Sequence, residues 1–331
     1  MCKQSAPHLL ETLGQVELKP TENLRKPLIA LVLNKRNTLK NTMPLIDLDS
    51  PMKKAYWSSY YCGNVLLQEG KKISSQLCRA RWCIRCNRIK TAELINGYKH
   101  LLNDFIAPHL VVVTMKNCKG RGLKSQHKKM NQAFQQCRWK IDRKHGIKIN
   151  GIRTWECTYN IQRDDYHPHF NVLIDSSEGA TLFLRYWMEY WQKKQGFKSV
   201  NRGGQSVSKI EGVKGLLEVF KYTTKLSVSH EEEYKAQDWI YQCVKGKRLA
   251  QPFGNLRKVK IAEEKTHQEE VEALANQIDI WAWEKEYKHY VNSWGETLVA
   301  EEEVEALESE LKEQKQKNKY KPKHEERYKP K

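Results

Sequence analysis

Apolar residues in the middle of the chain follow two spacings, one typical of strands and one typical of helices. Residues 109–116, HLVVVTMK, form a continuous β-branched run, which predicts a strand buried on both faces. Residues 151–160 and 166–175 also have strand composition, and the short IQRDD between them predicts a turn, so we expect these two strands to pair antiparallel. QSVSKIE, 205–211, predicts another strand, and PFGNLRKVKI predicts a last one.

Other stretches place apolar residues three and four apart, as helices do. They are residues 89–104, 125–144, 181–193, 213–226 and 232–244. The second of these repeats Met130, Phe134, Cys137 and Ile141 on one side and is strongly basic on the other. We therefore expect it to pack one face on a core and to expose a cationic face.

The two ends of the chain lack such clear patterns. Residues 1 to about 50 are weakly periodic and predict a loosely ordered arm. After about residue 262, one helical face carries Val271, Leu274, Ile278 and Trp281 within a charged segment. Beyond Glu301 the chain is almost entirely Glu, Lys and Gln, which leaves too little apolar surface to offset ordering, so we expect a frayed helix or disorder.

The charge of the chain concerns its partners more than its fold. The formal net charge of the 331 residues is +19, which favours nucleic acid as partner over an anionic membrane. No apolar run approaches the roughly 20 residues of a membrane-spanning helix. The N-terminus has no basic-then-apolar signal pattern. The sequence thus predicts a cytoplasmic DNA- or RNA-binding protein without membrane contact.

Four of the nine cysteines are clustered: Cys62, Cys78, Cys83 and Cys86. In a reducing compartment, a C-x-x-C pair with further nearby thiols is more typical of zinc than of disulfides. Four protein ligands leave no open position, so this Zn²⁺ site is predicted to be structural. Arginines at 79, 81, 85 and 88 are interleaved with it, and we expect them to face phosphates. The alternative is a set of unrelated buried thiols, the interpretation we adopt for the five scattered cysteines.

The stretch YHPHFNVLID places His167, His169 and Asn171 on one face of its strand, because strand side chains alternate. Two adjacent imidazoles can bind one divalent ion. The antiparallel partner strand carries Glu156, whose carboxylate is the candidate third ligand. The alternative is a pair of exposed histidines on a solvated face. Pro168 counts mildly against a regular strand because it lacks a backbone donor.

A third candidate group lies in GLLEVFKYTTK, residues 215–225. Helical spacing puts Glu218, Tyr222 and Lys225 on one face. A tyrosine hydroxyl is a poor nucleophile unless a neighbour such as a lysine or a metal eases loss of its proton. Taken alone, without the histidine pair, this segment is better explained as an ordinary Glu- and Lys-rich surface helix with a packed tyrosine.

In combination, these motifs resemble the HUH endonuclease superfamily, specifically the rolling-circle replication initiator (Rep) proteins of small bacterial plasmids. The resemblance runs from the cysteine cluster through PFGNLRKV, in the order HLVVVTMK, ECTYN, HPH and E-x-x-x-Y-x-x-K. It implies that His167 and His169 hold Mg²⁺ or Mn²⁺, with Glu156 as third ligand. It implies Tyr222 as nucleophile, with Glu218 activating water at termination and Lys225 nearby. Many relatives read HPHFH, where this chain has Asn171.

The resemblance further implies a fold and a set of partners. The fold is α+β, with an antiparallel HUH/RRM-like sheet, flanking helices and an N-terminal zinc-binding segment. The predicted domains are an arm (1–50), a four-cysteine zinc-binding segment with a helix (51–104), the HUH domain (105–262) and a charged helical, partly disordered tail (263–331). Single-stranded or extruded origin DNA would be nicked and rejoined through a 5′-phosphotyrosine, with host helicase and DNA polymerase as partners.

Other functions remain open from the sequence. A relaxase or single-strand transposase of the same superfamily would use the same chemistry in another context. A non-catalytic zinc-dependent DNA-binding regulator would account for the charge and the cysteines, but not for the histidines and the tyrosine segment. An RNA-binding protein is a further alternative, since a sheet with basic flanks can bind single strands.

Overall fold

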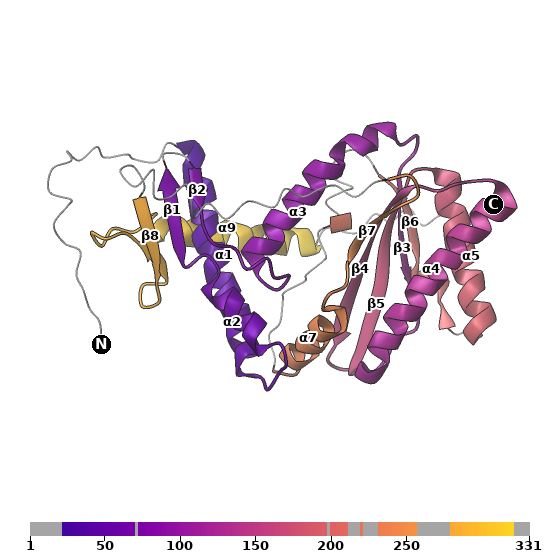
Figure 1. The fold of residues 1–331 in the computed structure, drawn as a ribbon, viewed down its shortest axis with the longest axis horizontal. Coiled ribbons are helices and arrows are strands. Elements are labelled where there is room, and N and C mark those ends of the chain that lie inside the picture. The colour runs from indigo at the N-terminus through magenta and orange to yellow at the C-terminus, as the bar shows by residue number, and fades with distance from the viewer. Residues whose placement is uncertain are drawn as a thin grey trace.

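The computed structural model describes residues 22–69, 72–196, 199–210, 219–220, 231–256 and 279–320. These residues form two sheets with helices packed around them (Figure 1). We call the part built on the larger sheet the large lobe and the part built on the smaller sheet the small lobe.

The sheet of the large lobe has the strand order β6-β3-β5-β4-β7, and all its pairings are antiparallel. Its strands are β3 (His109–Thr114), β4 (Gly151–Asn160), β5 (Asp165–Ile174), β6 (Ser206–Lys209) and β7 (Ala250–Phe253). The predicted pairing of residues 151–160 with 166–175 is confirmed, since β4 and β5 pair over ten positions across a tight turn. Asp164 closes that turn with a φ of 47°. An α+β protein with an antiparallel sheet is therefore confirmed.

One face of this sheet carries the main hydrophobic core. Phe170, Val172 and Ile174 of β5 point into it, as strand alternation predicts. Helices α4 (Leu123–His145) and α5 (Ser177–Gln195) cover this face (Figure 1). The predicted apolar face of α4 is buried at Met130, Phe134, Cys137 and Ile141. Helix α4 ends at Gly146, whose φ of 67° suits a residue without a side chain.

The opposite face of the sheet is covered at only one end. Ile152 and Leu173 pack there against Tyr98 and the short segment Val219–Phe220. Tyr98 ends α3 (Ile84–Tyr98), which continues into the 3-10 helix η1 (Lys99–Asp104). The histidines of β5 lie on this same face at the other end of the strand. The histidines therefore lie outside the main core, on the sheet face whose other end is covered by the apolar contacts of Tyr98, Val219 and Phe220.

The small lobe is assembled from both ends of the chain, which the sequence did not predict. Its sheet has the order β2-β1-β8-β9, from β2 (Lys72–Ser74), β1 (Val65–Glu69), β8 (Asp279–Glu284) and β9 (His289–Val291). Strand β8 pairs with β1, so Trp281 lies opposite Leu66 in a sheet rather than on a helix. The expectation that Trp281 lies on a helical face is therefore wrong, and Val271, Leu274 and Ile278 of that expected face lie outside the described residues. A short strand finds its partner through contacts distant in sequence, which local spacing cannot report.

The N-terminal arm is also corrected where it is described. Residues Glu22–Asp47 form helix α1, which buries Leu28 and Val32 against the small sheet. Helix α2 (Lys53–Tyr61) follows it, and the charged helix α9 (Glu301–Tyr320) packs on α1. Arg36 of α1 forms a two-pronged ion pair with Glu301, at 2.8 and 2.6 Å. Helix α1 looked weakly periodic because different parts of it pack on different elements.

Helix α7 (Glu231–Val244) joins the two lobes. The buried carboxylate of Asp238 accepts hydrogen bonds at Oδ1 from Ser50 (2.6 Å) and Tyr56 (2.5 Å), and at Oδ2 from Gln242 (2.7 Å). The rings of Tyr56, Trp82 and Tyr241 pack together beside it. This junction holds the cysteine-rich segment against the large lobe. Among the described helices, none is long and apolar enough to cross a membrane.

Candidate active site and metal centre

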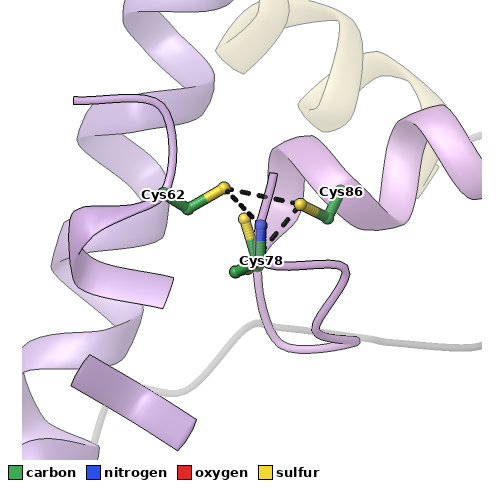
Figure 2. A group of neighbouring side chains, drawn as sticks. Cys62, Cys78 and Cys86 are labelled. Carbon is green, nitrogen blue, oxygen red and sulfur yellow. Dashed lines mark hydrogen bonds between the residues drawn. The ribbon is translucent and has the colours of Figure 1, made fainter. Parts of the chain in front are cut away.

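The four clustered cysteines come together in the small lobe, although they are spread over residues 62–86 of the sequence. Their sulfurs lie within 4.8 Å of one another, and each cysteine is a free thiol. Cys62 Sγ is 3.5 Å from Cys86 Sγ, which is 3.6 Å from Cys78 Sγ (Figure 2). A tetrahedral Zn²⁺ with Zn–S bonds of about 2.3 Å requires sulfurs about 3.8 Å apart. Disulfide sulfurs would lie about 2 Å apart. The cluster therefore fits a tetrahedral metal ion.

The backbone around the cysteines donates to their sulfurs, as it does around thiolate ligands. The amide of Cys78 points at Cys62 Sγ (3.3 Å), and the amide of Ala80 points at Cys78 Sγ (3.4 Å). The loop between them is tight, and Arg79 adopts a φ of 54°. These donors favour the deprotonated thiolate that zinc requires.

Two buried cations lie against the cluster. Lys35 of α1 donates from Nζ to the carbonyls of Tyr60 (2.6 Å) and Cys62 (3.0 Å). Burial lowers its pKa to about 8, so the ammonium stays charged at neutral pH. Arg85 is also buried and passes beside Gly63, where an added Cβ would overlap its guanidinium. Two positive charges offset the −2 charge that zinc and four thiolates would carry.

The expectation that all four interleaved arginines face phosphates is wrong for two of them. Arg85 is buried beneath the cysteines. Arg81 donates to the backbone carbonyls of Val244 and Lys247 at the end of α7. Arg79 and Arg88 remain exposed. The spacing of the arginines in sequence could not show which of them are buried and which are exposed, because that depends on α1 and α7 lying against the cluster.

The second candidate site lies where β4 and β5 pair. Register places Glu156 directly opposite His169, and His169 Nε2 is 3.0 Å from Glu156 Oε2. The rings of His167 and His169 are 5.6 Å apart between centroids and point the same way from the strand. The Glu156 side chain is 5% exposed and the His169 side chain 14%, so the carboxylate is buried and the imidazole keeps a small exposed surface. A donor set of imidazole nitrogens and a carboxylate oxygen can bind a divalent ion once the ligands close around it.

The histidine site is looser than the cysteine cluster. Within the part of the chain that the structure describes, only the four cysteines bring three or more ligand atoms within 4.8 Å of one another. His167 instead contacts Thr114, whose Oγ1 is 3.4 Å from its Nε2. Burial lowers the pKa of His167 below its ordinary value, which keeps the imidazole neutral. A neutral imidazole is the form that binds a metal.

A polar chain that we did not predict orients His167. Its Nδ1 is 2.7 Å from Asn117 Oδ1, while Asn117 Nδ2 donates to Asp165 Oδ1 at 3.0 Å. Arg163 Nε pairs with the other oxygen of Asp165 at 3.2 Å. With Nδ1–H directed at Asn117, Nε2 is the nitrogen left to bind an ion. The only sequence signal for Asn117 is its place just after the buried strand β3.

Pro168 and Asn171 fit this arrangement. The Pro168 nitrogen faces the side of β5 that lies just beyond the end of β3, so no ladder bond is lost. The Pro168 carbonyl accepts from Thr114 Oγ1 at 3.1 Å. Asn171 Nδ2 lies 3.4 Å from Glu156 Oε2 and is directed at the carboxylate. Asn171 therefore contacts the acidic residue, at the position where many relatives carry a histidine.

The third predicted group, Glu218, Tyr222 and Lys225, lies outside the described residues. The neighbouring Val219 and Phe220 are described, helical and buried. Thr154 Oγ1 donates to the Val219 carbonyl at 2.8 Å. Thr154 is two residues before Glu156 on β4 and so projects from the same face of the sheet. Phe220 also stacks on Tyr98, with centroids 6.0 Å apart. This segment is therefore anchored on the face that carries the histidines.

Comparisons with known proteins agree with the family resemblance inferred from the sequence motifs. A family profile described as "Replication protein" matches residues 70–301, well over half of the chain. The chain is similar to "Protein rep" of Staphylococcus aureus, with 25% identity over 62% of this chain and 92% of that protein. It is also similar to "Protein rep" of a Bacillus species, at 26% over 37% of this chain and 43% of that protein, and of Bacillus amyloliquefaciens, at 25% over 31% and 32%. No solved structure matches. The chain belongs to the replication protein family, which confirms the resemblance to plasmid rolling-circle Rep proteins.

Proposed function

We propose that this replication protein initiates plasmid replication by nicking and rejoining one strand of origin DNA through a 5′-phosphotyrosine at Tyr222. The observation that carries the proposal is the shared sheet face. It presents the Glu156–His169 pair and His167, and it anchors the segment next to Tyr222 through the Thr154–Val219 hydrogen bond. Membership of the replication protein family supports action on DNA.

His167, His169 and Glu156 would hold a Mg²⁺ or Mn²⁺ ion. Such an ion, when bound, polarises a phosphate oxygen and neutralises charge that develops in phosphoryl transfer. The residues of the chain supply its position. Asn117 fixes the tautomer of His167, and Asn171 directs the Glu156 carboxylate. The partly exposed His169 leaves the site accessible to a substrate phosphate.

Tyr222 would be the nucleophile. In sequence it stands two residues after Phe220, which belongs to a described segment anchored on the same sheet face as the histidines. Its oxygen forms a bond to phosphorus, the bond from phosphorus to O3′ breaks, and the 3′ oxygen takes up a proton. Lys225 favours loss of the phenol proton. At termination, Glu218 activates a water molecule, so no second tyrosine is needed.

The zinc centre would be structural rather than catalytic. Its four thiolates close the coordination sphere, and Arg81 ties it to α7 of the large lobe. Origin DNA would lie in contact with exposed lysines and arginines, whose charges pair with its phosphates. Host DNA polymerase would then extend the 3′ end in the cytoplasm, with a host helicase as a further partner. An HUH-type arrangement of the sheet is part of this proposal.

A denaturing gel tests the proposal. The protein is incubated with Mn²⁺ and labelled single-stranded origin DNA beside Tyr222→Phe, His169→Ala and a Tyr287→Phe control, whose tyrosine is 69% exposed in the small lobe. A covalent adduct that is lost in the first two variants and kept in the control is expected. Binding without any adduct would overturn the nuclease and favour the zinc-dependent regulator. An adduct on transposon-end or transfer-origin strands instead would favour a transposase or relaxase.

A further inference from the structure

Helix α2 of the small lobe (Figure 1) carries an aromatic cluster that neither candidate site uses. Trp57 is 37% exposed and Tyr61 57% exposed. Their rings are nearly parallel, with an interplanar angle of 21° and centroids 5.7 Å apart. Large aromatic side chains on a surface are usually scattered singly. A stacked pair of exposed aromatic rings on one helix face is therefore a candidate binding surface.

The cluster is held rigid from below. Tyr60 is almost buried and meets both exposed rings edge-on, with centroids 5.2 Å from Trp57 and 5.1 Å from Tyr61. The Tyr60 carbonyl is tied to Lys35 beneath the helix. Rings that are already fixed lose little conformational entropy when a planar group stacks on them.

Positive charge surrounds these rings. Lys53 is four residues before Trp57, which is four before Tyr61, so the three share one helix face, with exposed Lys54 beside it. Lys285, from the hairpin between β8 and β9, places Nζ 5.4 Å from the centre of the Tyr60 ring. Glu284 and Glu286 are its sequence neighbours, yet it is the ammonium group that lies on the aromatic cluster.

We propose that Trp57, Tyr61 and Lys285 form a secondary binding surface for single-stranded DNA. Exposed aromatic faces beside lysines are what nonspecific single-strand binding requires, because every base can stack and every phosphate can pair with a cation. A base stacks on the outward face of Tyr61, and Lys53, Lys54 and Lys285 contact the flanking phosphates. Duplex DNA keeps its bases stacked inside, so it gains only the phosphate contacts.

This surface lies on the small lobe, away from the histidine face of the large sheet. That the protein handles a single strand rests on the proposed function, but binding at α2 needs neither nicking nor Tyr222. The surface would hold a stretch of strand outside the active site, as a nicked or extruded origin provides.

The test is the affinity of the full chain for a labelled 30-nucleotide oligo(dT) and for a duplex of equal length, by fluorescence anisotropy without divalent ions. Trp57→Ala combined with Tyr61→Ala should weaken oligo(dT) binding about 10-fold or more and leave duplex binding unchanged. Trp57→Phe with Tyr61→Phe should retain most of the affinity. Trp294→Ala is the matched control, because Trp294 is 67% exposed on the same lobe. Lys285→Gln should make the slope of log binding constant against log salt concentration shallower by the equivalent of about one phosphate contact.

Three outcomes would overturn the surface. They are unchanged oligo(dT) affinity, an equal loss on duplex, and a change of oligomeric state alone, which would assign the face to a second copy of the chain. If the double variant does not fold, crosslinking of the unaltered protein to bromodeoxyuridine oligonucleotides replaces it. Adducts at Trp57 or Tyr61 support the surface, and adducts confined elsewhere refute it. Aromatic-dependent strand binding without any covalent adduct would count against the proposed nicking alone.

Discussion

The cysteine centre and the histidine face are both candidate metal sites, but they are built in opposite ways. The cysteines gather four sulfurs within 4.8 Å, from a stretch of 25 residues, and bury three of the four residues. The histidine face gathers its candidate ligands from two paired strands, and its rings stand 5.6 Å apart. A closed, fully protein-ligated site stabilises a fold, whereas an incomplete set leaves positions for substrate. The degree of closure therefore separates the structural role proposed for the cysteines from the catalytic role proposed for the histidines.

The largest expected effect is loss of the metal from the cysteine centre. Cys86→Ser, or removal of zinc by a chelator, should unfold the small lobe, because structural zinc contributes about 10–16 kcal/mol in small zinc domains. Metal analysis should find a single zinc ion per chain, and thermal unfolding should lose its cooperative transition after chelation. Cys118→Ser, outside the cluster, is the control and should keep both. A metal-free protein of undiminished stability would contradict the zinc centre.

Loss of one histidine should instead lower the rate of nicking without lowering the stability of the protein. His169→Ala should reduce nicking about 10²–10³-fold, the usual cost of removing one group that stabilises transition-state charge. Zinc content and the melting temperature should stay close to those of the unaltered protein. His145→Ala, at an exposed histidine on α4, serves as control. If both histidine variants nicked at the same rate, the β5 face would not be the active site.

The orientation of His167 gives a smaller and more specific test. Asn117→Ala removes the acceptor at Nδ1 and should weaken the apparent Mn²⁺ affinity in nicking assays about 10–100-fold. Excess Mn²⁺ should restore most of the rate, which a general folding defect would not allow. Asn131→Ala provides the comparison, because that amide bonds only within α4. An unchanged Mn²⁺ dependence would exclude a positioning role for Asn117.

The junction between the lobes should contribute to stability but not to metal binding. Asp238→Asn keeps an oxygen acceptor but removes the negative charge that strengthens the hydrogen bonds donated by Ser50 and Tyr56. The free energy of unfolding should therefore fall by about 1–2 kcal/mol. Urea denaturation at neutral pH measures it. Gln242→Ala, which leaves both inter-lobe bonds, should cost less. Equal losses in the two variants would show that the junction bonds contribute nothing of their own.

The last expected effect appears only below about pH 6.5, as a dependence of the stability of the large lobe on pH. Burial lowers the pKa of His127 to about 4, whereas the unfolded chain titrates near 6.5. The unfolded state therefore takes up a proton first, and stability that is full above pH 6.5 is lost as pH falls toward 4. His127→Gln should flatten this dependence in denaturation curves from pH 7 to 4.5. Parallel curves for both proteins would rule out the contribution of His127.

Local pattern was most informative where an element packs on a single surface. The paired strands 151–160 and 166–175 and the helix around Phe134 were predicted within a few residues, because alternation and helical spacing report one continuous buried face. The same logic put the histidines and Glu156 on adjacent strands. It failed for α1 and for the strand around Trp281, whose apolar contacts are divided among several elements.

The sequence by itself determined the residue types that carry chemistry and the antiparallel strands that hold them. Cysteine spacing, strand alternation and net charge are local or additive properties, so they survive without a structure. Only the tertiary structure decided that Lys35 lies against the cysteine-rich segment, that Asn117 orients His167, and that both chain ends build one sheet. Each of these contacts joins segments far apart in the chain, and burial, not sequence spacing, brings them together.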